Sequence, residues 1–163
     1  MRRALVSALL FLAACVPADA PADAPASDGG DGAAVVTRVV DGDTVEVEFE
    51  GLELDVRLIG IDTPETVKPG EPVECFGPQA SAYTEDRLEG RTVRLEFDVE
   101  RIDPFDRTLA YVWVGDELFN ETLVREGTAL VTTFPPNVKY VDRFRDAQRL
   151  ARDEGLGLWS ACR

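Results

Sequence analysis

The sequence predicts an α+β domain, mainly β, in which five strands form a small barrel and about three helices pack against it. Two observations predict this fold. Five short runs rich in β-branched residues read as strands, and segments with helical character follow the third and the fifth run. The chain has 163 residues, of which 45% are hydrophobic, and this composition suits one domain with its own core.

The strands are expected at residues 34–40, 44–49, 54–61, 92–99 and 108–114. Asp41, Gly42 and Asp43 lie between the first two, and this composition is typical of a hairpin turn. The third strand ends where Pro64 forces the preceding residue into an extended conformation. Residues 62–77 are therefore expected to form an irregular loop.

The helices are expected at residues 79–88, 118–126 and 140–154, and Gly90, Gly127 and Gly155 are expected to stop them. Pro78 stands at a favourable start position for the first. The third helix places Phe144, Ala147, Leu150 and Ala151 on one face. Five strands with one helix after the third and two after the fifth match a five-stranded OB-fold barrel.

The first fifteen residues resemble a secretory signal, because two arginines precede an apolar run at residues 4–14 that is too short to span a membrane. Leu-Ala-Ala before Cys15 resembles a bacterial lipobox, so Cys15 is expected to become the lipidated mature N-terminus. The alternative is ordinary cleavage after Ala20, but Pro21 would then follow the cut. We therefore expect an extracytoplasmic protein that is lipid-anchored to a bacterial membrane.

Residues 16–33 consist mainly of Ala, Asp, Pro and Gly, and are expected to form a disordered tether before the domain at residues 34–163. Two further cysteines, Cys75 and Cys162, are expected to form a disulfide in an oxidising compartment. The alternative is two free thiols. Removal of Cys75 is expected to lower stability and to leave catalysis unchanged.

The composition restricts the chemistry that the protein can use. After residue 33 the chain has 15 basic and 27 acidic residues, a net charge of about −12, which argues against a generic basic patch for polyanions. Histidine is absent, which excludes Ser-His-Asp triads, Cys-His pairs and most zinc hydrolase sites. Hydrolysis would have to use carboxylates, arginines and a hard metal.

Carboxylates gather at two places in the sequence. Asp41 and Asp43 flank a glycine, so both could reach one ion, although such a turn by itself is more often only a hairpin. Asp62 and Glu65 stand at the end of an apolar strand, and the neighbouring proline fixes the Thr63 carbonyl beside them. A set of oxygen ligands without nitrogen or sulfur favours Ca²⁺.

Four blocks of the sequence are distinctive: Asp-Gly-Asp-Thr at 41–44, Arg-Leu-Ile-Gly-Ile-Asp-Thr-Pro-Glu at 57–65, Arg-Thr-Leu-Ala-Tyr at 107–111 and Asn-Glu-Thr-Leu-Val-Arg-Glu-Gly at 120–127. In this order and at about this spacing they are similar to the staphylococcal nuclease (thermonuclease) family. The resemblance covers about residues 34–159 and includes the closing Gly-Leu-Gly-Leu-Trp at residues 155–159.

The resemblance implies a role for each of the acidic positions. Asp43 and Asp62 would hold Ca²⁺ directly, the Thr63 carbonyl would complete the protein ligands, and Asp41 would assist nearby. Glu65 matches the catalytic glutamate of the family, a general base for the water that attacks phosphorus.

Arg57 and Arg107 match the two arginines of the family, which bind phosphate oxygens and stabilise the charge of the transition state. The resemblance therefore implies a calcium-dependent phosphodiesterase that hydrolyses DNA, RNA or both with little base specificity and leaves 3′-phosphate ends. A monomer is expected.

The chain departs from the family at Pro104-Phe105-Asp106, where Lys-Tyr-Gly is common, and at Thr133, where a tyrosine is expected. Phe105 and Phe134 could stack on a base or could pack against the protein. One alternative is an OB-fold lipoprotein that binds nucleic acid or another polyanion without catalysis. The other is a structural or adhesive lipoprotein that binds divalent ions for stability.

Overall fold

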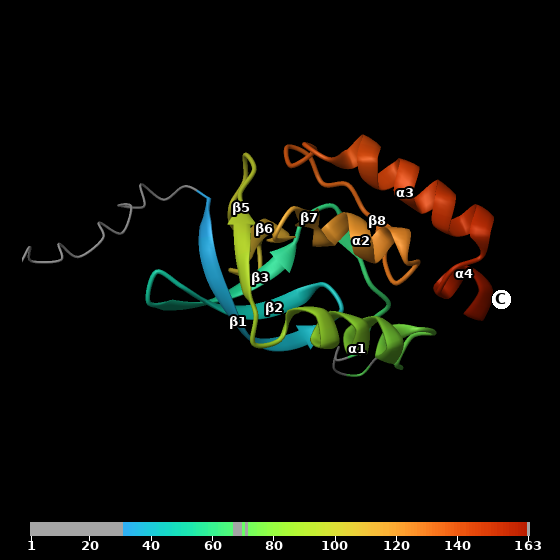
Figure 1. Ribbon diagram of the computed structural model, residues 1–163, viewed down its shortest axis with the longest axis horizontal. Helices are drawn as coiled ribbons and strands as arrows, with labels where there is room; N and C mark the ends of the chain where they lie inside the picture. The colour runs from blue at the N-terminus through green and yellow to red at the C-terminus, as the bar shows by residue number, and fades with distance from the viewer. Residues whose placement is uncertain (1–30, 67–69, 71, 163) are drawn as a thin grey trace, which may run out of the picture.

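A closed five-stranded barrel forms one part of the structure, and helices cover its side and one end (Figure 1). The computed structural model describes residues 31–66, 70 and 72–162. The barrel strands are β1 (Gly32–Asp41), β2 (Thr44–Phe49), β3 (Leu52–Leu58), β5 (Thr92–Glu96) and β6 (Thr108–Val114). They pair antiparallel in the order β3-β2-β1-β5-β6, and a parallel pairing of β3 with β6 closes the barrel. The predicted OB-type barrel is confirmed.

Apolar side chains, which alternate with polar ones along the strands, fill the barrel interior. In β2, Val45 and Val47 are fully buried and Phe49 is nearly so, while Glu48 between them is exposed. Leu58 and Leu95 add large apolar side chains from β3 and β5. The core is therefore apolar because successive residues of a strand point to opposite faces of the sheet.

The predicted strand at residues 54–61 is divided in two. Gly60 adopts φ of +81°, and a Cβ there would lie 2.7 Å from the ring of Phe144. The chain turns at this point, and a short strand β4 (Ile61–Asp62) pairs with β8 (Leu130–Val131) outside the barrel. A further short strand, β7 (Glu117–Leu118), lies at the open side of β6.

The described residues form three substantial helices, as predicted, and a single-turn helix follows them. They are α1 (Gly77–Leu88), α2 (Phe119–Arg125), α3 (Val141–Glu154) and α4 (Leu158–Ala161). In α3, Phe144, Ala147 and Ala151 are buried as expected, but Leu150 is 45% exposed and does not belong to the packed face. Figure 1 shows α2 between the barrel and much of α3. Phe144 of α3 nevertheless reaches the core directly, since its ring packs against that of Tyr111 on β6.

A disulfide joins Cys75, just before α1, to Cys162, just after α4, with an S–S distance of 2.04 Å and a Cα–Cα distance of 5.8 Å. The predicted pairing is therefore present in the structure. It connects the loop that leads into α1 with the end of the helical part of the fold.

The N-terminal strand begins at Gly32, so Gly32 and Ala33 belong to β1 and not to the expected tether. The expected signal segment with Cys15, and residues 16–30 of the tether, lie outside the described residues. Within the described part of the chain, no helix has both the length and the apolar character needed to cross a membrane.

Candidate functional site

The turn between β1 and β2 is pressed against the segment that follows β4. Asp43 is only 4% exposed, and its Oδ2 accepts hydrogen bonds from the Thr63 backbone N–H at 2.6 Å and from Thr63 Oγ1 at 3.0 Å. A Cβ on Gly42 would lie 2.8 Å from three atoms of the Thr63 side chain. Glycine is therefore required at position 42, because only a residue without a side chain permits this approach.

Arg57 lies between two of the predicted metal ligands. Its Nε is 3.2 Å from Asp43 Oδ1, and its Nη2 donates to Asp62 Oδ1 at 2.7 Å. Its Nη1 donates to the carbonyls of Leu58 at 3.1 Å and Ile61 at 2.9 Å. The side chain is only 14% exposed, so the guanidinium is held in one orientation at the end of β3.

The carboxylates of Asp41 and Asp43 lie close enough to interact electrostatically. Burial and the neighbouring charge of Asp43 raise the pKa of Asp41 to about 6. Among the residues that the structure describes, no three Asp, Glu or Cys side chains already surround a common point. The donor set nevertheless fits a hard cation, because Asp41, Asp43 and Asp62 supply oxygen only and a cation would relieve the repulsion that raises the pKa of Asp41.

Glu65 lies on the irregular segment that follows β4, as predicted. It is half-buried, and its Oε1 accepts a hydrogen bond from the Thr66 backbone N–H at 2.8 Å. Its own backbone N–H donates to Glu74 Oε2 at 3.0 Å. Glu74, in the part of the loop just before α1, thus holds the backbone of Glu65 in place.

Arg107 stands just before β6 and is held by Asp103, four residues earlier. Its Nε and Nη2 both lie 2.7 Å from Asp103 Oδ2, and its guanidinium carbon lies 5.4 Å from the centre of the Phe105 ring. Burial would raise the pKa of Asp103, but hydrogen bonds from the backbone and side chain of Arg107 outweigh it and lower that pKa. Asp103 therefore stays ionised and orients the arginine.

A pocket lies between the two arginines and has a volume of about 470 Å³, within the range of about 300–1,000 Å³ that is typical of ligand sites. Three of the predicted site residues line it: Arg57, Asp62 and Arg107. Phe105 and Phe134 also line the pocket and are 79% and 71% exposed, so they do not pack in the core.

Asp41, Asp43, Thr63 and Glu65 do not line this pocket, although Asp43 contacts Arg57 directly. The predicted residues therefore do not all meet in one pocket. Arg57, Asp62 and Arg107 line it, and Asp43 adjoins it through its contact with Arg57.

Two residues of this region were not singled out from the sequence. Asp103 fixes Arg107, and no role was expected for it from the sequence. Asn137, which lines the pocket, exchanges hydrogen bonds with the backbone of Glu100 at 2.8 and 2.7 Å and so joins two loops. The spacing of Asp103 and Arg107 was visible in the sequence, whereas nothing near Asn137 indicates its distant partner.

A closed OB-type barrel with two carboxylate-held arginines at one pocket defines a nuclease-like class of OB-fold protein. Residues 55–161 match the family model described as staphylococcal nuclease homologue. The chain belongs to the staphylococcal nuclease family.

Relatives of this chain carry nuclease names. This chain is 47% identical over 125 residues to a thermonuclease of Staphylococcus hyicus. It is 49% identical over 125 residues to a thermonuclease of Staphylococcus intermedius. Each of these alignments covers 77% of this chain and 74% of the relative. It is also 40% identical over 125 residues to Endonuclease YncB of Bacillus subtilis, covering 76% of this chain and 59% of that protein.

Proposed function

We propose that the protein is a calcium-dependent phosphodiesterase that hydrolyses DNA, RNA or both with little base specificity and leaves 3′-phosphate ends. Family membership and the thermonuclease and endonuclease names of the relatives support a nuclease. The observation that carries the proposal is the pocket itself, because Arg57 of β3 and Arg107, just before β6, line one space beside Asp62.

The two arginines suit a phosphate because each guanidinium presents several N–H donors in a planar fork. Arg57 is fixed by Asp43 and Asp62, and Arg107 is fixed by Asp103. Donors that are already oriented need little reorganisation as charge develops on the phosphate oxygens. Their assigned role is to hold the phosphate and to stabilise the transition state.

Glu65 is assigned as the general base. Water oxygen bonds to phosphorus as the bond from phosphorus to the 5′ oxygen breaks, and Glu65 takes a proton from that water. The 5′ oxygen leaves with a proton from solvent. A carboxylate suits the role because its ionised form predominates near neutral pH.

The residues that would hold Ca²⁺ are Asp43 and Asp62 through their carboxylates and Thr63 through its carbonyl, with Asp41 nearby. When bound, the ion would supply positive charge that attracts and polarises the phosphate. That contribution suits a chain whose net charge is −14, since such a protein otherwise repels a polyanion.

Low base specificity is supported by the two exposed phenylalanines of the pocket. Phe105 and Phe134 offer ring faces, and stacking on a ring accepts every base.

The cellular setting is part of the proposal. We assign Cys15 as the lipidated N-terminus, which would place a monomeric enzyme outside the cytoplasm and on a bacterial membrane. Mass spectrometry of the mature N-terminus tests this assignment. A diacylglyceryl-modified Cys15 is expected, whereas an unmodified chain beginning at Pro21 would contradict it.

The function is tested by incubating the purified full-length chain with single-stranded DNA and with RNA, in Ca²⁺ and in excess chelator. Hydrolysis is expected in Ca²⁺ only, with phosphate on the 3′ ends of the products. Binding of either polymer without any cleavage would instead favour the non-catalytic OB-fold alternative. Cleavage that persists in chelator would contradict the calcium requirement.

A further inference from the structure

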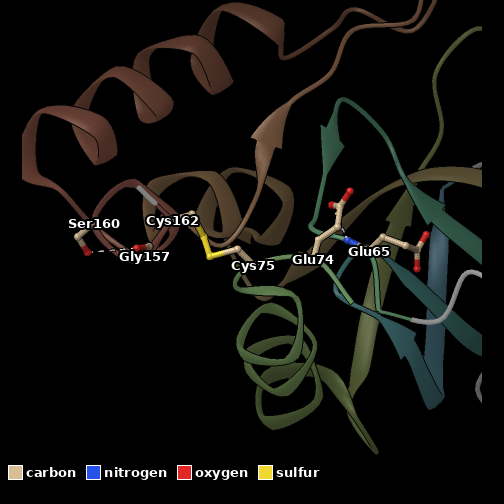
Figure 2. The surroundings of a disulfide bond; sticks show 6 residues. All are labelled: Glu65, Glu74, Cys75, Gly157, Ser160 and Cys162. Carbon is tan, nitrogen blue, oxygen red and sulfur yellow. Dashed lines mark hydrogen bonds between the residues drawn. A yellow bond between two sulfur atoms is a disulfide. The ribbon is translucent and has the colours of Figure 1, made fainter. Parts of the chain in front are cut away.

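The turn that contains Cys75 holds the backbone of Glu65 on both sides (Figure 2). Glu74 accepts the hydrogen bond of the Glu65 N–H with its Oε2 at 3.0 Å, and its own N–H donates to the Glu65 carbonyl at 2.9 Å. Both polar groups of the Glu65 peptide backbone are thus engaged by one residue. Glu74 is immediately followed by Cys75.

The start of α1 packs tightly against the same segment. A Cβ on Gly77 would lie 3.0 Å from the carbonyl oxygens of Pro64 and Glu65 and 2.7 Å from Thr66 Cγ2. Gly77 also closes the turn by donating its N–H to the Glu74 carbonyl at 3.1 Å. Glu65 therefore lies against the turn at residues 74–77, which one hydrogen bond ties to Glu65 and another closes on itself.

The disulfide fastens this turn to a firmly seated part of the fold. Cys162 follows α4, and the first residue of α4, Leu158, donates its N–H to the Gly127 carbonyl at 2.9 Å. A Cβ on Gly157 would lie 2.2 Å from that same carbonyl oxygen, so the two chain segments touch through their backbones. The covalent link therefore connects Glu65, through Glu74 and Cys75, to α4.

We propose that Glu74 and the Cys75–Cys162 disulfide position Glu65 for its role in hydrolysis. The inference rests on the proposed function and adds two positioning elements to it. Displacement of a reacting group by about 1 Å can lower a rate by about a hundredfold, so a carboxylate on an irregular segment needs external support. This proposal differs from the expectation from the sequence, in which removal of Cys75 lowers stability and leaves catalysis unchanged.

Glu74 is tested by comparing Glu74→Ala with Glu74→Gln. Alanine removes the acceptor of the Glu65 N–H, and kcat on single-stranded DNA should fall about tenfold or more with KM unchanged. Glutamine keeps a carbonyl oxygen in the same place, so Glu74→Gln should retain most of kcat. Equal kcat for the parent protein and Glu74→Ala would overturn the role of Glu74.

The disulfide is tested with the double variant Cys75→Ser and Cys162→Ser, assayed well below its melting temperature. We expect kcat to fall several-fold or more with KM unchanged. Dithiothreitol should produce the same loss in the parent protein, since the reagent is oxidised as two cysteine thiols form, and should not affect the double variant. The matched control is Phe49→Leu, which destabilises the far end of β2 and should keep kcat.

Hydrogen exchange supplies a readout that does not depend on activity. The amides of Glu65 and Thr66 should exchange faster in Glu74→Ala and in the double serine variant than in Phe49→Leu. Unchanged exchange in both variants, or an equal loss of kcat in Phe49→Leu, would overturn the inference. If the parent protein hydrolyses nothing, the proposed function fails, and the exchange rates alone decide whether Glu65 is positioned in this way.

Discussion

Arg57 donates to two carboxylates and two backbone carbonyls, whereas Arg107 depends on one carboxylate, Asp103. The difference matters for experiments, because a change at Arg57 would also disturb Asp43 and the end of β3. Arg107 is the better probe of phosphate binding, since its side chain is partly exposed and its ion pair with Asp103 lies outside the barrel strands.

The first prediction concerns Glu65→Gln and Arg107→Ala. Each should lower kcat by about 10²- to 10⁴-fold, because a general base and a transition-state donor are lost. Arg125→Ala is the matched control, since Arg125 is also an arginine bound to a glutamate, at 3.0 Å from Glu154, but lies on α2. Kinetic assays with circular dichroism separate catalysis from folding. Parent-like turnover in either site variant would refute that residue's role.

The second prediction concerns Asp41→Asn. Its carboxylate is partly buried beside that of Asp43, and the substitution removes their repulsion. In chelator at pH 8 the variant should therefore be more stable than the parent by about 1–2 kcal/mol, while the stabilisation by added Ca²⁺ should shrink. Thermal unfolding with and without Ca²⁺ measures both effects. The control Asp153→Asn removes an exposed charge and should leave both values unchanged, and a destabilised Asp41→Asn would contradict the account.

At the level of single residues, the sequence predicts well which residues belong to the site, but it predicts poorly which residues contact them. The positions of Asp43, Arg57 and Asp62 follow from short motifs at strand ends, and the structure brings these three into contact. Glu74 could not be predicted as a partner of Glu65, because the contact depends on how an irregular loop folds back.

Among the elements, α2 is fixed to the barrel by one buried amide. Asn120 is fully buried. Its Nδ2 donates to the Ile59 carbonyl and its Oδ1 accepts from the Val112 N–H, both at 2.9 Å. The side chain thus joins the end of β3, the middle of β6 and the start of α2.

The third prediction is that Asn120→Ala lowers the free energy of unfolding by about 2–4 kcal/mol, because a buried donor and a buried acceptor lose their partner. Urea denaturation measures the change. Glu126→Ala, an exposed position at the end of the same helix, should change it by less than about 0.5 kcal/mol. A loss of similar size in the two variants would show that the amide bridge contributes little.

The barrel strands and the three main helices were predictable because alternation and helical periodicity are local signals. The division of β3 from β4 was not, because Gly60 turns there to make room for Phe144 of a distant helix. The short pairing of β4 with β8 depends on the same tertiary contact. The pocket could not be predicted from the sequence either, since its two arginines lie far apart along the chain.

For the molecule as a whole, one carboxylate links the barrel to the segment that leads into α3. Glu96 on β5 is 4% exposed and accepts hydrogen bonds from Trp113 Nε1 at 2.7 Å, from the Tyr140 hydroxyl at 2.9 Å and from the Lys139 ammonium. Burial would raise the pKa of Glu96, but these donors outweigh it and lower the pKa below 4.5.

The fourth prediction follows from the sign of that shift. A lowered pKa in the folded state contributes stability above pH 4.5, and this contribution is lost as pH falls through the folded-state pKa. Glu96→Gln should therefore be less stable than the parent at pH 7 and should lose less stability between pH 4.5 and pH 3. Denaturation midpoints across this range measure the slope. Glu48→Gln is an exposed control, and a parent-like slope in Glu96→Gln would contradict the assignment.

The parallel pairing of β3 with β6 sets Arg57 beside Leu109 and is the contact that turns an open sheet into a barrel. Pairing between such distant segments has a large loop-closure entropy and is expected to form slowly. The pocket between the arginines cannot exist before this step. During refolding, ligand binding should therefore appear only once the barrel has closed, and a ligand that occupies the pocket should draw partly folded chains toward the closed state.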